Sequence, residues 1–451
     1  MSFPRYPKYK DSGVEWWGEM PDDWHLFPAK RSFSRKKELN WGMKCENRLS
    51  LTLGGVVPRD LDDLDGLQAS EFETYQIFSA DDLVFKLIDL QNIKTSRVGL
   101  VPVMGIMSPA YIRVQPDKAK IVPKFAYWFF TNLYNRCIFN ELGGGVRQTI
   151  SSEELLLLPF PYLSLSDQAR IAEFLDRETA KIDELVLEQQ RLMELLKEKR
   201  QAVISHAVTG KQQVVEQKRA DGTSAFSLQP SALPKKPSGI EWLGDVPAHW
   251  TVEKMKWVAE MQSGHTPDKK IPKYWEGGDI PWVSLNDTGY LKENDYITET
   301  AHSVTQAGIE NSSARLLPAR VVVFSRDATI GRCAITTRPM CVSQHFIAWV
   351  CGDSILPEYL LLRLRSMTQE LDRLCFGSTV KTIGMPDVRT LATPVPPVKE
   401  QQAIIEHVKT ETTKLDTLTT ETQRAIDLLQ ERRTALISAA VTGQIDVRQN
   451  N

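Results

Sequence analysis

The sequence lacks the features that most directly assign a metal site or a membrane location. Its six cysteines show no CxxC spacing and no paired histidines, so a zinc site is disfavoured and reduced thiols are expected. No run of residues approaches the ~20 consecutive apolar residues that a membrane-spanning helix needs. The first ten residues are polar and basic, unlike a signal peptide. We therefore expect a soluble cytoplasmic protein without a metal ion of its own.

Catalytic motifs are missing as well. The Gly210-Lys211 pair lacks the upstream glycine and the following Ser or Thr of a phosphate-binding loop. The run 394–398 has neither the amide nor the aromatic residue of an adenine methyltransferase motif, and Pro386-Asp387 lacks the acidic-x-lysine element of a nuclease. His265 and His345 are candidates for acid–base work, but neither has a partner at a recognisable spacing. The sequence therefore predicts a protein that positions chemistry carried out by another subunit.

What the sequence does contain is a duplication. Residues 168–210 and 401–443 align without a gap at a constant offset of 233, and they are identical at 22 of 43 positions. A second repeat precedes each copy, from Ser12 to Trp24 and from Ser238 to Trp250, at an offset of 226. We call this second repeat the leading segment. Its tryptophans are expected to anchor it on the adjacent domain.

The stretches between these repeats, about 27–145 and 253–380, align poorly with one another. A chain of 451 residues is also too long for one hydrophobic core. We therefore expect, in order, a globular domain, a helix, a linker, a second globular domain, and a helix with a tail. These five segments are 1–160, 161–210, 211–236, 237–395 and 396–451.

Each repeated helix carries apolar or long side chains at alternating steps of four and three residues, which is the spacing of a coiled-coil seam. In the first copy the seam consists of Ile171, Leu175, Glu178, Ile182, Leu185, Gln189, Leu192, Leu196, Lys199 and Val203. In the second copy it consists of Ile404, Val408, Glu411, Leu415, Leu418, Thr422, Ala425, Leu429, Arg432 and Leu436. Helices of this length would protrude from their domains, so we expect the two copies to pair as a coiled coil.

The ends of these helices can be placed from their capping residues. Ser166 is a candidate N-cap, with Asp167 in the first turn. Gly210 and Gly443 stand where a left-handed residue would end each helix. At ~1.5 Å per residue, each helix would be a rod on the order of 60 Å long.

The variable domains show an α+β pattern. Short apolar runs bounded by turn-forming residues predict strands at 82–87, 110–114, 320–324 and 345–350. Two segments that begin with proline, 123–130 and 357–364, predict helices.

These motifs resemble the specificity subunits of type I restriction-modification systems over nearly the whole chain. The resemblance rests on Ser-Gly-(Val/Ile)-Glu-Trp-x-Gly-x-x-Pro-x-x-Trp in both leading segments and on Ser263–Pro267 continuing to Tyr274–Val283. It also rests on the Pro-x-Pro runs at 159–161 and 394–396, on the following Asp167-Gln168 or Glu400-Gln401, and on the Ala-Val-Thr-Gly endings of both helices.

The resemblance implies two target-recognition domains separated by two helices that pack antiparallel, with a pseudo-twofold relation within one chain. Each domain would read one half of an asymmetric bipartite site in double-stranded DNA, and the helices would set the unread spacer. Two methyltransferase subunits and two restriction/translocase subunits would dock on the chain. The S-adenosylmethionine, ATP and magnesium would bind to those partners, so this chain would be a non-catalytic component with no cofactor.

One departure from the family pattern lies in the first domain, which offers Leu51–Val57 in place of the Ser-Gly-x-Thr-Pro run. The net charge of −2 excludes a uniformly basic surface but not a binder whose cations gather on one face. DNA contacts are therefore assigned by residue type, since phosphates need Lys or Arg and base edges need polar groups on loops. The candidates in the second half are Ser263, His265, Thr266, Arg326, Ser378, Lys381 and Thr382. In the first half they are Lys36, Lys37, Lys94, Arg97, Arg147, Gln148 and Thr149.

Two rival hypotheses remain open at this point. If the chain is a structural coiled-coil adaptor that does not read DNA, the target specificity should stay the same when residues 27–145 are exchanged for another such domain. A stand-alone enzyme would transfer methyl groups or cleave DNA as the isolated chain.

Overall fold

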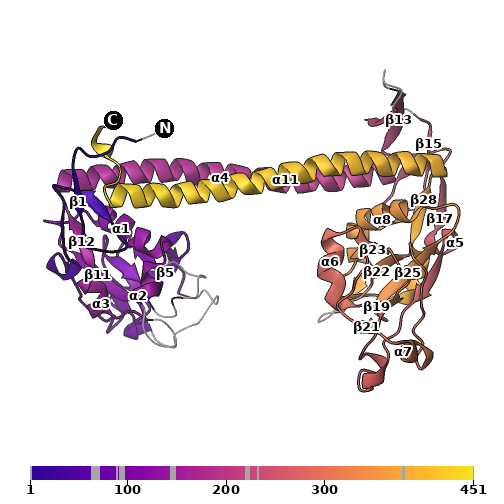
Figure 1. Cartoon of the computed structure of the whole chain (residues 1–451), viewed down its shortest axis with the longest axis horizontal. Helices are drawn as coiled ribbons and strands as arrows, with labels where there is room; N and C mark the ends of the chain where they lie inside the picture. The colour runs from indigo at the N-terminus through magenta and orange to yellow at the C-terminus, as the bar shows by residue number, and fades with distance from the viewer. Residues whose placement is uncertain are drawn as a thin grey trace. The chain divides into compact units, whose positions relative to one another are not determined.

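The structure is a computed structural model that describes residues 3–61, 72–87, 90, 97–142, 149–218, 224–230, 233–377 and 381–449 (Figure 1). Contacts divide the chain into two compact units. Unit 1 comprises Met1–Gln190 and Gln423–Asn451, and unit 2 comprises Arg191–Thr422. Each unit therefore combines one globular domain with one half of each long helix.

The globular domain of unit 1 contains two four-stranded sheets, and it has the expected α+β composition. In sheet order, the first consists of β6 (Gly55–Arg59), β5 (Arg48–Thr52), β10 (Gly105–Met107) and β7 (Gln76–Phe78). The second consists of β4 (Phe33–Ser34), β11 (Ile112–Pro116), β8 (Leu83–Phe85) and β9 (Val98–Leu100). The helices are η1 (Ala29–Arg31), η2 (Phe72–Thr74), α1 (Pro123–Asn135), α2 (Ile138–Leu142) and α3 (Ser152–Leu157). Helix α1 begins at the expected proline and buries Phe125, Phe129 and Phe130 against this second sheet and β12.

The globular domain of unit 2 contains a five-stranded and a three-stranded sheet. In sheet order, the first consists of β18 (Ala259–Ser263), β25 (Phe346–Cys351), β22 (Val322–Ser325), β23 (Cys333–Thr336) and β20 (Tyr296–Ile297). The second consists of β21 (Ser303–Val304), β19 (Ile280–Val283) and β24 (Cys341–Val342). The helices are α5 (Met255–Val258), η3 (Pro272–Tyr274), η4 (Leu285–Asp287), α6 (Thr288–Glu293), α7 (Gln306–Glu310), α8 (Pro357–Ser366), α9 (Thr368–Arg373) and α10 (Met385–Thr390).

The two domains share a strand order although their sequences align poorly. The order β4-β11-β8-β9 recurs as β18-β25-β22-β23, and the parallel pair β10 and β5 recurs as β24 and β19. The segment Leu51–Val57 forms the β5–β6 hairpin. It is therefore not the structural counterpart of Ser263–Pro267. That counterpart is the segment after β4, which begins at Arg35.

Short antiparallel pairs join these parts. The leading segments form β1 (Tyr9–Asp11) with β2 (Glu19–Pro21), and β15 (Lys235–Pro237) with β16 (Asp245–Pro247). The strand before each long helix pairs with the strand after each leading segment, as β12 (Pro159–Tyr162) with β3 (His25–Pro28), and β28 (Ala392–Val395) with β17 (Thr251–Lys254). The predicted linker holds a hairpin of β13 (Gln212–Lys218) and β14 (Ser224–Pro230). The remaining elements are β26 (Cys375–Phe376), β27 (Thr382–Ile383) and η5 (Val447–Gln449).

The two long helices are α4 (Leu165–Val208) and α11 (Val398–Val441). The N-cap of α4 is Ser164 rather than Ser166, because the Ser164 Oγ accepts a hydrogen bond from the Asp167 N–H at 3.1 Å. Both helices end at the expected glycines, with φ of +70° at Gly210 and +76° at Gly443. Within the described part of the chain, no helix has both the length and the apolar character to cross a membrane.

In each unit, the early part of one long helix packs with the late part of the other, so the two run antiparallel. In unit 1, Ile171 and Leu175 share a hydrophobic core with Ile437 and Ala440. In unit 2, Ile204 shares a core with Ile404 and Val408.

Ile171 and Ile404 are buried at the start of the predicted seam, but farther along the helices one heptad position of the seam is buried and the other is largely exposed. Leu175, Ile182, Leu196, Val408, Leu415 and Leu436 are buried, and Val203 and Leu429 are half-buried. Leu185, Leu192 and Leu418, however, are 42–47% exposed. The contact positions lie one residue later, for example at Thr179 and Thr412, which are buried. Their hydroxyls donate to the carbonyls four residues earlier, at 2.6 and 2.8 Å, so burial leaves no polar group unpaired.

A glutamine near the start of each long helix holds the globular domain. The Gln401 Oε1 accepts from the Leu356 N–H at 2.9 Å, and its Nε2 donates to the Ser354 and Pro396 carbonyls, both at 2.8 Å. The equivalent Gln168 accepts from Val122 and donates to the Lys120 and Leu163 carbonyls, at 2.8–3.0 Å. Both glutamine side chains are fully buried. The same three hydrogen bonds therefore fix the helix start in each half.

Each leading segment packs against the C-terminal end of one long helix. A Cβ on Gly210 would lie 2.2 Å from Pro247 Cδ, and one on Gly443 would lie 2.4 Å from Pro21 Cδ. Trp24 and Trp250 are each 1% exposed, which agrees with their expected anchoring role. In unit 1, the N-terminal leading segment therefore packs against the C-terminal end of α11.

Candidate nucleic-acid interface

The Ser263–Pro267 segment is fixed by a close backbone approach to β24. A Cβ on Gly264 would lie 1.9 Å from the Val342 carbonyl oxygen, which leaves room only for glycine. The adjacent His265 N–H donates to the same carbonyl at 3.1 Å. This contact places Thr266 beside the loop that follows β24. Ser263, at the end of β18, remains exposed.

That loop carries two polar side chains that the sequence did not identify as DNA contacts. Thr266 Oγ1 hydrogen bonds to Gln344 Oε1, and Gln344 is an exposed residue. His345 Nδ1 lies 2.8 Å from Asp327 Oδ2, while its Nε2 lies 3.4 Å from Gln344 Nε2. The His345 side chain is 37% exposed, whereas that of Asp327 is 12% exposed. The buried carboxylate therefore orients an accessible imidazole next to an accessible amide.

Arg326, Lys381 and Thr382 join the same surface. Arg326 donates from Nη1 to the Ile383 carbonyl at 3.1 Å and from Nε to the Gln344 carbonyl at 3.3 Å. Thr382 Oγ1 hydrogen bonds to Asp327 Oδ1. Lys381 is exposed, and its carbonyl accepts from the Ala328 N–H at 2.8 Å. Four segments that are separate in sequence thus present the side chains of Thr266, Arg326, Gln344, His345, Lys381 and Thr382 together. We call this set the polar cluster.

Ser378 lies outside the described residues, as do Lys94, Arg147 and Gln148 of the first half. Lys36, Lys37 and Thr149 are exposed. Arg97 is 1% exposed and donates from Nη2 to the Leu90 carbonyl at 2.8 Å, so the structure places this candidate inside the domain rather than among the exposed ones.

The first half presents its exposed candidates at the places where the polar cluster lies in the second half. The Ile150 N–H donates to the Leu87 carbonyl at 3.2 Å, as the Ile383 N–H donates to the Arg326 carbonyl at 2.9 Å. Thr149 therefore occupies the position of Thr382. The segment with Lys36 and Lys37 follows β4, as the segment with Thr266 follows β18. The two domains thus share the backbone arrangement at these places, but the side chains exposed there differ.

Two ion pairs between the long helices are also duplicated. Arg433 donates to both carboxylate oxygens of Asp183, at 2.8 and 3.2 Å, within unit 1. Arg200 Nε donates to Asp416 Oδ1 at 3.0 Å within unit 2. Arg200 and Arg433 are equivalent at the repeat offset of 233, and so are Asp183 and Asp416.

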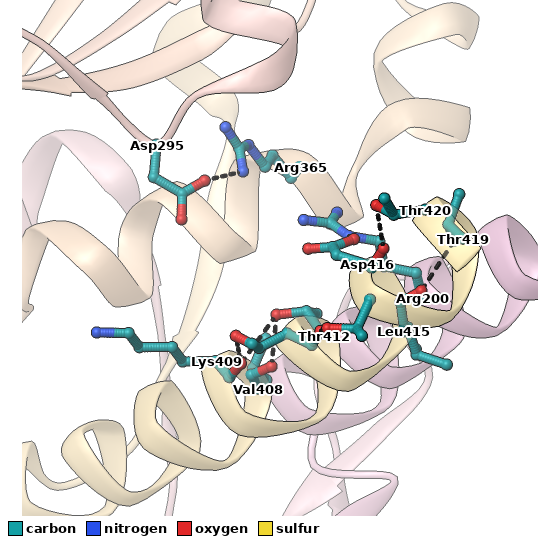
Figure 2. A network of polar contacts seen from close by, with 12 residues as sticks. Arg200, Asp295, Arg365, Val408, Lys409, Thr412, Leu415, Asp416, Thr419 and Thr420 are labelled. Atoms are coloured by element: carbon teal, nitrogen blue, oxygen red, sulfur yellow. Dashed lines mark hydrogen bonds and ion pairs between the residues drawn. The ribbon is translucent and has the colours of Figure 1, made fainter. Parts of the chain in front are cut away.

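The unit 2 ion pair borders a groove between the long helices and the globular domain, where Arg365 also pairs with Asp295 (Figure 2). The groove has a volume of about 330 Å³. The hydroxyls of Thr412 and Thr420 along α11 bond to backbone carbonyls of the same helix (Figure 2). The polar groups along this stretch are thus largely paired within the protein.

Buried titratable groups in unit 2 are structural. Burial raises the pKa of the Cys333 thiol to about 11 and that of Cys351 to about 12, so neither forms a thiolate at neutral pH. Burial lowers the pKa of Arg363 to about 10, which leaves it charged, and its guanidinium lies 4.7 Å from the Trp242 ring centroid. Among the described residues, no group of three His, Cys, Asp or Glu side chains is placed to hold a metal ion.

Comparisons with known proteins agree with this duplicated arrangement. The model of the type I restriction modification DNA specificity domain matches residues 66–196 and 247–427, more than half of the chain. The MjaIX specificity subunit of Methanocaldococcus jannaschii is 32% identical over 164 residues, which cover 36% of this chain and 38% of that protein. The EcoR124I/EcoR124II specificity subunit of Escherichia coli is 26% identical over 332 residues, which cover 70% of each chain.

Solved structures share the fold. A chain from a structure described as the basis of complex assembly and conformational transition of the type I R-M system matches with a TM-score of 0.70 and 15% identity, and covers 94% of this chain and 99% of that chain. The HsdS subunit of Thermoanaerobacter tengcongensis matches with a TM-score of 0.54 and 15% identity, over 94% and 98% of the two chains. With the family model matching both halves, the chain belongs to the family of type I restriction-modification DNA specificity proteins.

Proposed function

We propose that this chain reads a bipartite, asymmetric DNA site and directs partner enzymes to it, without catalysing a reaction itself. The observation that carries the proposal is the shared strand order of the two domains combined with different exposed side chains at equivalent places. The polar cluster of the second domain offers an amide, an imidazole, two hydroxyls and two cations. The first domain offers Lys36, Lys37 and Thr149 at matching positions.

These groups suit DNA by their chemistry. An amide such as that of Gln344 can make two hydrogen bonds to an adenine edge, while Arg326 and Lys381 suit phosphates or guanine edges. The rigid support from Thr266 and Asp327 limits the entropy lost when DNA binds. Each domain would then read one half-site, and the paired helices would set the spacer, as protein geometry sets half-site separation in two-fold DNA binders.

The long helices are proposed to dock two methyltransferase subunits, after which two restriction/translocase subunits join. The support is that the same leucines are exposed in both copies of the helix. Leu185 and its equivalent Leu418 are 44% and 47% exposed. Leu195 and its equivalent Leu428 are 53% and 55% exposed. A surface that occurs twice in one chain suits two copies of one partner. S-adenosylmethionine, ATP and magnesium would bind to those partners.

The test uses the full chain reconstituted with its methyltransferase on a target mapped by sequencing methylated host DNA. Gln344→Ala should relax the preference at one base pair of one half-site by about tenfold or more. Lys381→Ala should weaken binding to all sequences alike and reduce its salt dependence. Lys292→Ala, at an exposed position of α6, is the matched control and should change neither. If the reconstituted protein methylates no defined site, the proposal fails and the coiled-coil adaptor gains support.

A further inference from the structure

Beside the polar cluster lies a cavity of about 500 Å³ within the globular domain of unit 2. Its walls come from the segment after β18, from β19 with η4, from the loop before β21, and from the loop after β24. The lining residues are Thr266, Lys269, Trp275, Trp282, Ser284, Leu285, Asn286, His302, Ser343, Gln344 and His345. The volume is that of a small-molecule site.

One residue that lines the cavity carries an unpaired hydroxyl. Ser343 is fully buried, and its Oγ has no hydrogen-bond partner within the described chain. Its backbone is fully used, since its N–H donates to the Val283 carbonyl at 2.8 Å and its carbonyl accepts from the Phe346 N–H at 3.0 Å. A buried polar group without a partner costs folding free energy, so this hydroxyl would gain from a hydrogen bond to a ligand in the cavity.

One wall is aromatic and offers only ring surface. The Trp275 and Trp282 rings pack edge to face, with centroids 5.0 Å apart. Their indole N–H groups are occupied, because Trp275 donates to the Asp268 carbonyl and Trp282 to the His265 carbonyl, both at 3.1 Å. Such a wall favours a flat, apolar ligand face.

The remaining walls supply neutral hydrogen-bonding groups and one cation. Asn286 Nδ2 lies 2.9 Å from His302 Nε2, and Gln344 contributes a further amide. Lys269 is exposed at the cavity and carries the only formal charge among the lining residues other than the histidines. Among the residues that the structure describes, no carboxylate lines the cavity. The lining therefore suits a flat ring with donor and acceptor edges that carries a negative group.

We propose that this cavity binds a single nucleotide, with its base against Trp275 and hydrogen-bonded to Ser343, and with its phosphate near Lys269. The inference rests on the proposed function, because Thr266, Gln344 and His345 belong to both the cavity and the polar cluster. A base that leaves the duplex at the half-site could therefore enter directly. A free nucleotide has the same chemistry and would fill the same space.

The first measurement is calorimetric titration of the full chain with each of dAMP, dCMP, dGMP and TMP. Ser343→Ala should weaken binding about threefold to tenfold, as expected for one hydrogen bond. Trp275→Leu should weaken it about tenfold or more through lost stacking. Ser32→Ala removes a different buried, unpaired hydroxyl in unit 1 and should have no effect.

The second measurement places 2-aminopurine at successive positions of the mapped target duplex and records its fluorescence, which rises when the base unstacks. A rise at one position that is lost in Ser343→Ala and Trp275→Leu supports a base from the target. Nucleotide binding that depends on both residues, without unstacking, supports a free nucleotide in the same cavity. If no nucleotide binds and no position unstacks while the target is still methylated, the inference is wrong and the proposed function stands.

Discussion

The glutamine at the start of each long helix provides a quantitative test of the duplicated architecture. Gln401→Ala removes three buried hydrogen bonds at 2.8–2.9 Å and leaves the Leu356 N–H and the Ser354 and Pro396 carbonyls without their partner. Each buried group left unpaired costs ~1–3 kcal/mol, and partial relaxation reduces the total. We therefore expect a loss of about 3–5 kcal/mol in the free energy of unfolding of unit 2.

The assay is urea-induced unfolding of the full chain, followed by tryptophan fluorescence. Because each unit has its own hydrophobic core, Gln401→Ala should shift the transition of unit 2 alone, and Gln168→Ala should shift that of unit 1. Gln402→Ala, at an exposed neighbouring position, is the control. A loss below about 1 kcal/mol for both buried glutamines would show that these hydrogen bonds do not hold the domains on the helices.

Three further predictions address the motif, the tail and the docking surface. Gly264→Ala should abolish specific DNA binding and lower the melting temperature, because the added Cβ would collide with the Val342 carbonyl. A Cβ added at Gly289 would meet no atom within 4 Å, so Gly289→Ala is the control and should change neither property in the same two assays. Hydrogen bonding to Arg448 lowers the pKa of Asp446 below its usual 3.8, so this carboxylate stabilises the fold above that pH and the benefit is lost as pH falls. Asp446→Asn should accordingly melt below the wild type at pH 7, and this difference should shrink as pH falls below 3.8. A difference that does not shrink on acidification would contradict this assignment. Leu185→Asp should reduce the number of bound methyltransferase subunits from two to one in native mass spectrometry, and retention of both would exclude Leu185 from the docking surface.

Much of the helical architecture was predictable from the sequence because the repeat is gapless and its ends carry glycine. The register of the seam was only half predictable. The heptad pattern favoured Leu185 and Leu418 because they continue the alternating steps of four and three residues. In the structure, the inward positions include Thr179 and Thr412, whose hydroxyls bond within the helix and therefore tolerate burial.

The candidate site was predictable only in part, because its frame forms through contacts distant in sequence. The Ser263–Pro267 motif pointed to Thr266, but Gln344 and Asp327 join it from other strands and belong to no recognisable motif. The sequence also could not show which candidate residues are buried, as the case of Arg97 shows. The common strand order of the two domains could not be seen in their sequences, since strand pairing depends on backbone hydrogen bonds that many different side chains permit.

The most direct test of the central claim is exchange of residues 27–145 for the corresponding domain of another family member, followed by mapping of the methylated sites. If each domain reads DNA independently and the long helices set the spacer, one half-site should have a new sequence, while the other half-site and the spacer stay unchanged. An unchanged target, or a change in both half-sites, would contradict the claim that each domain reads its own half of the DNA.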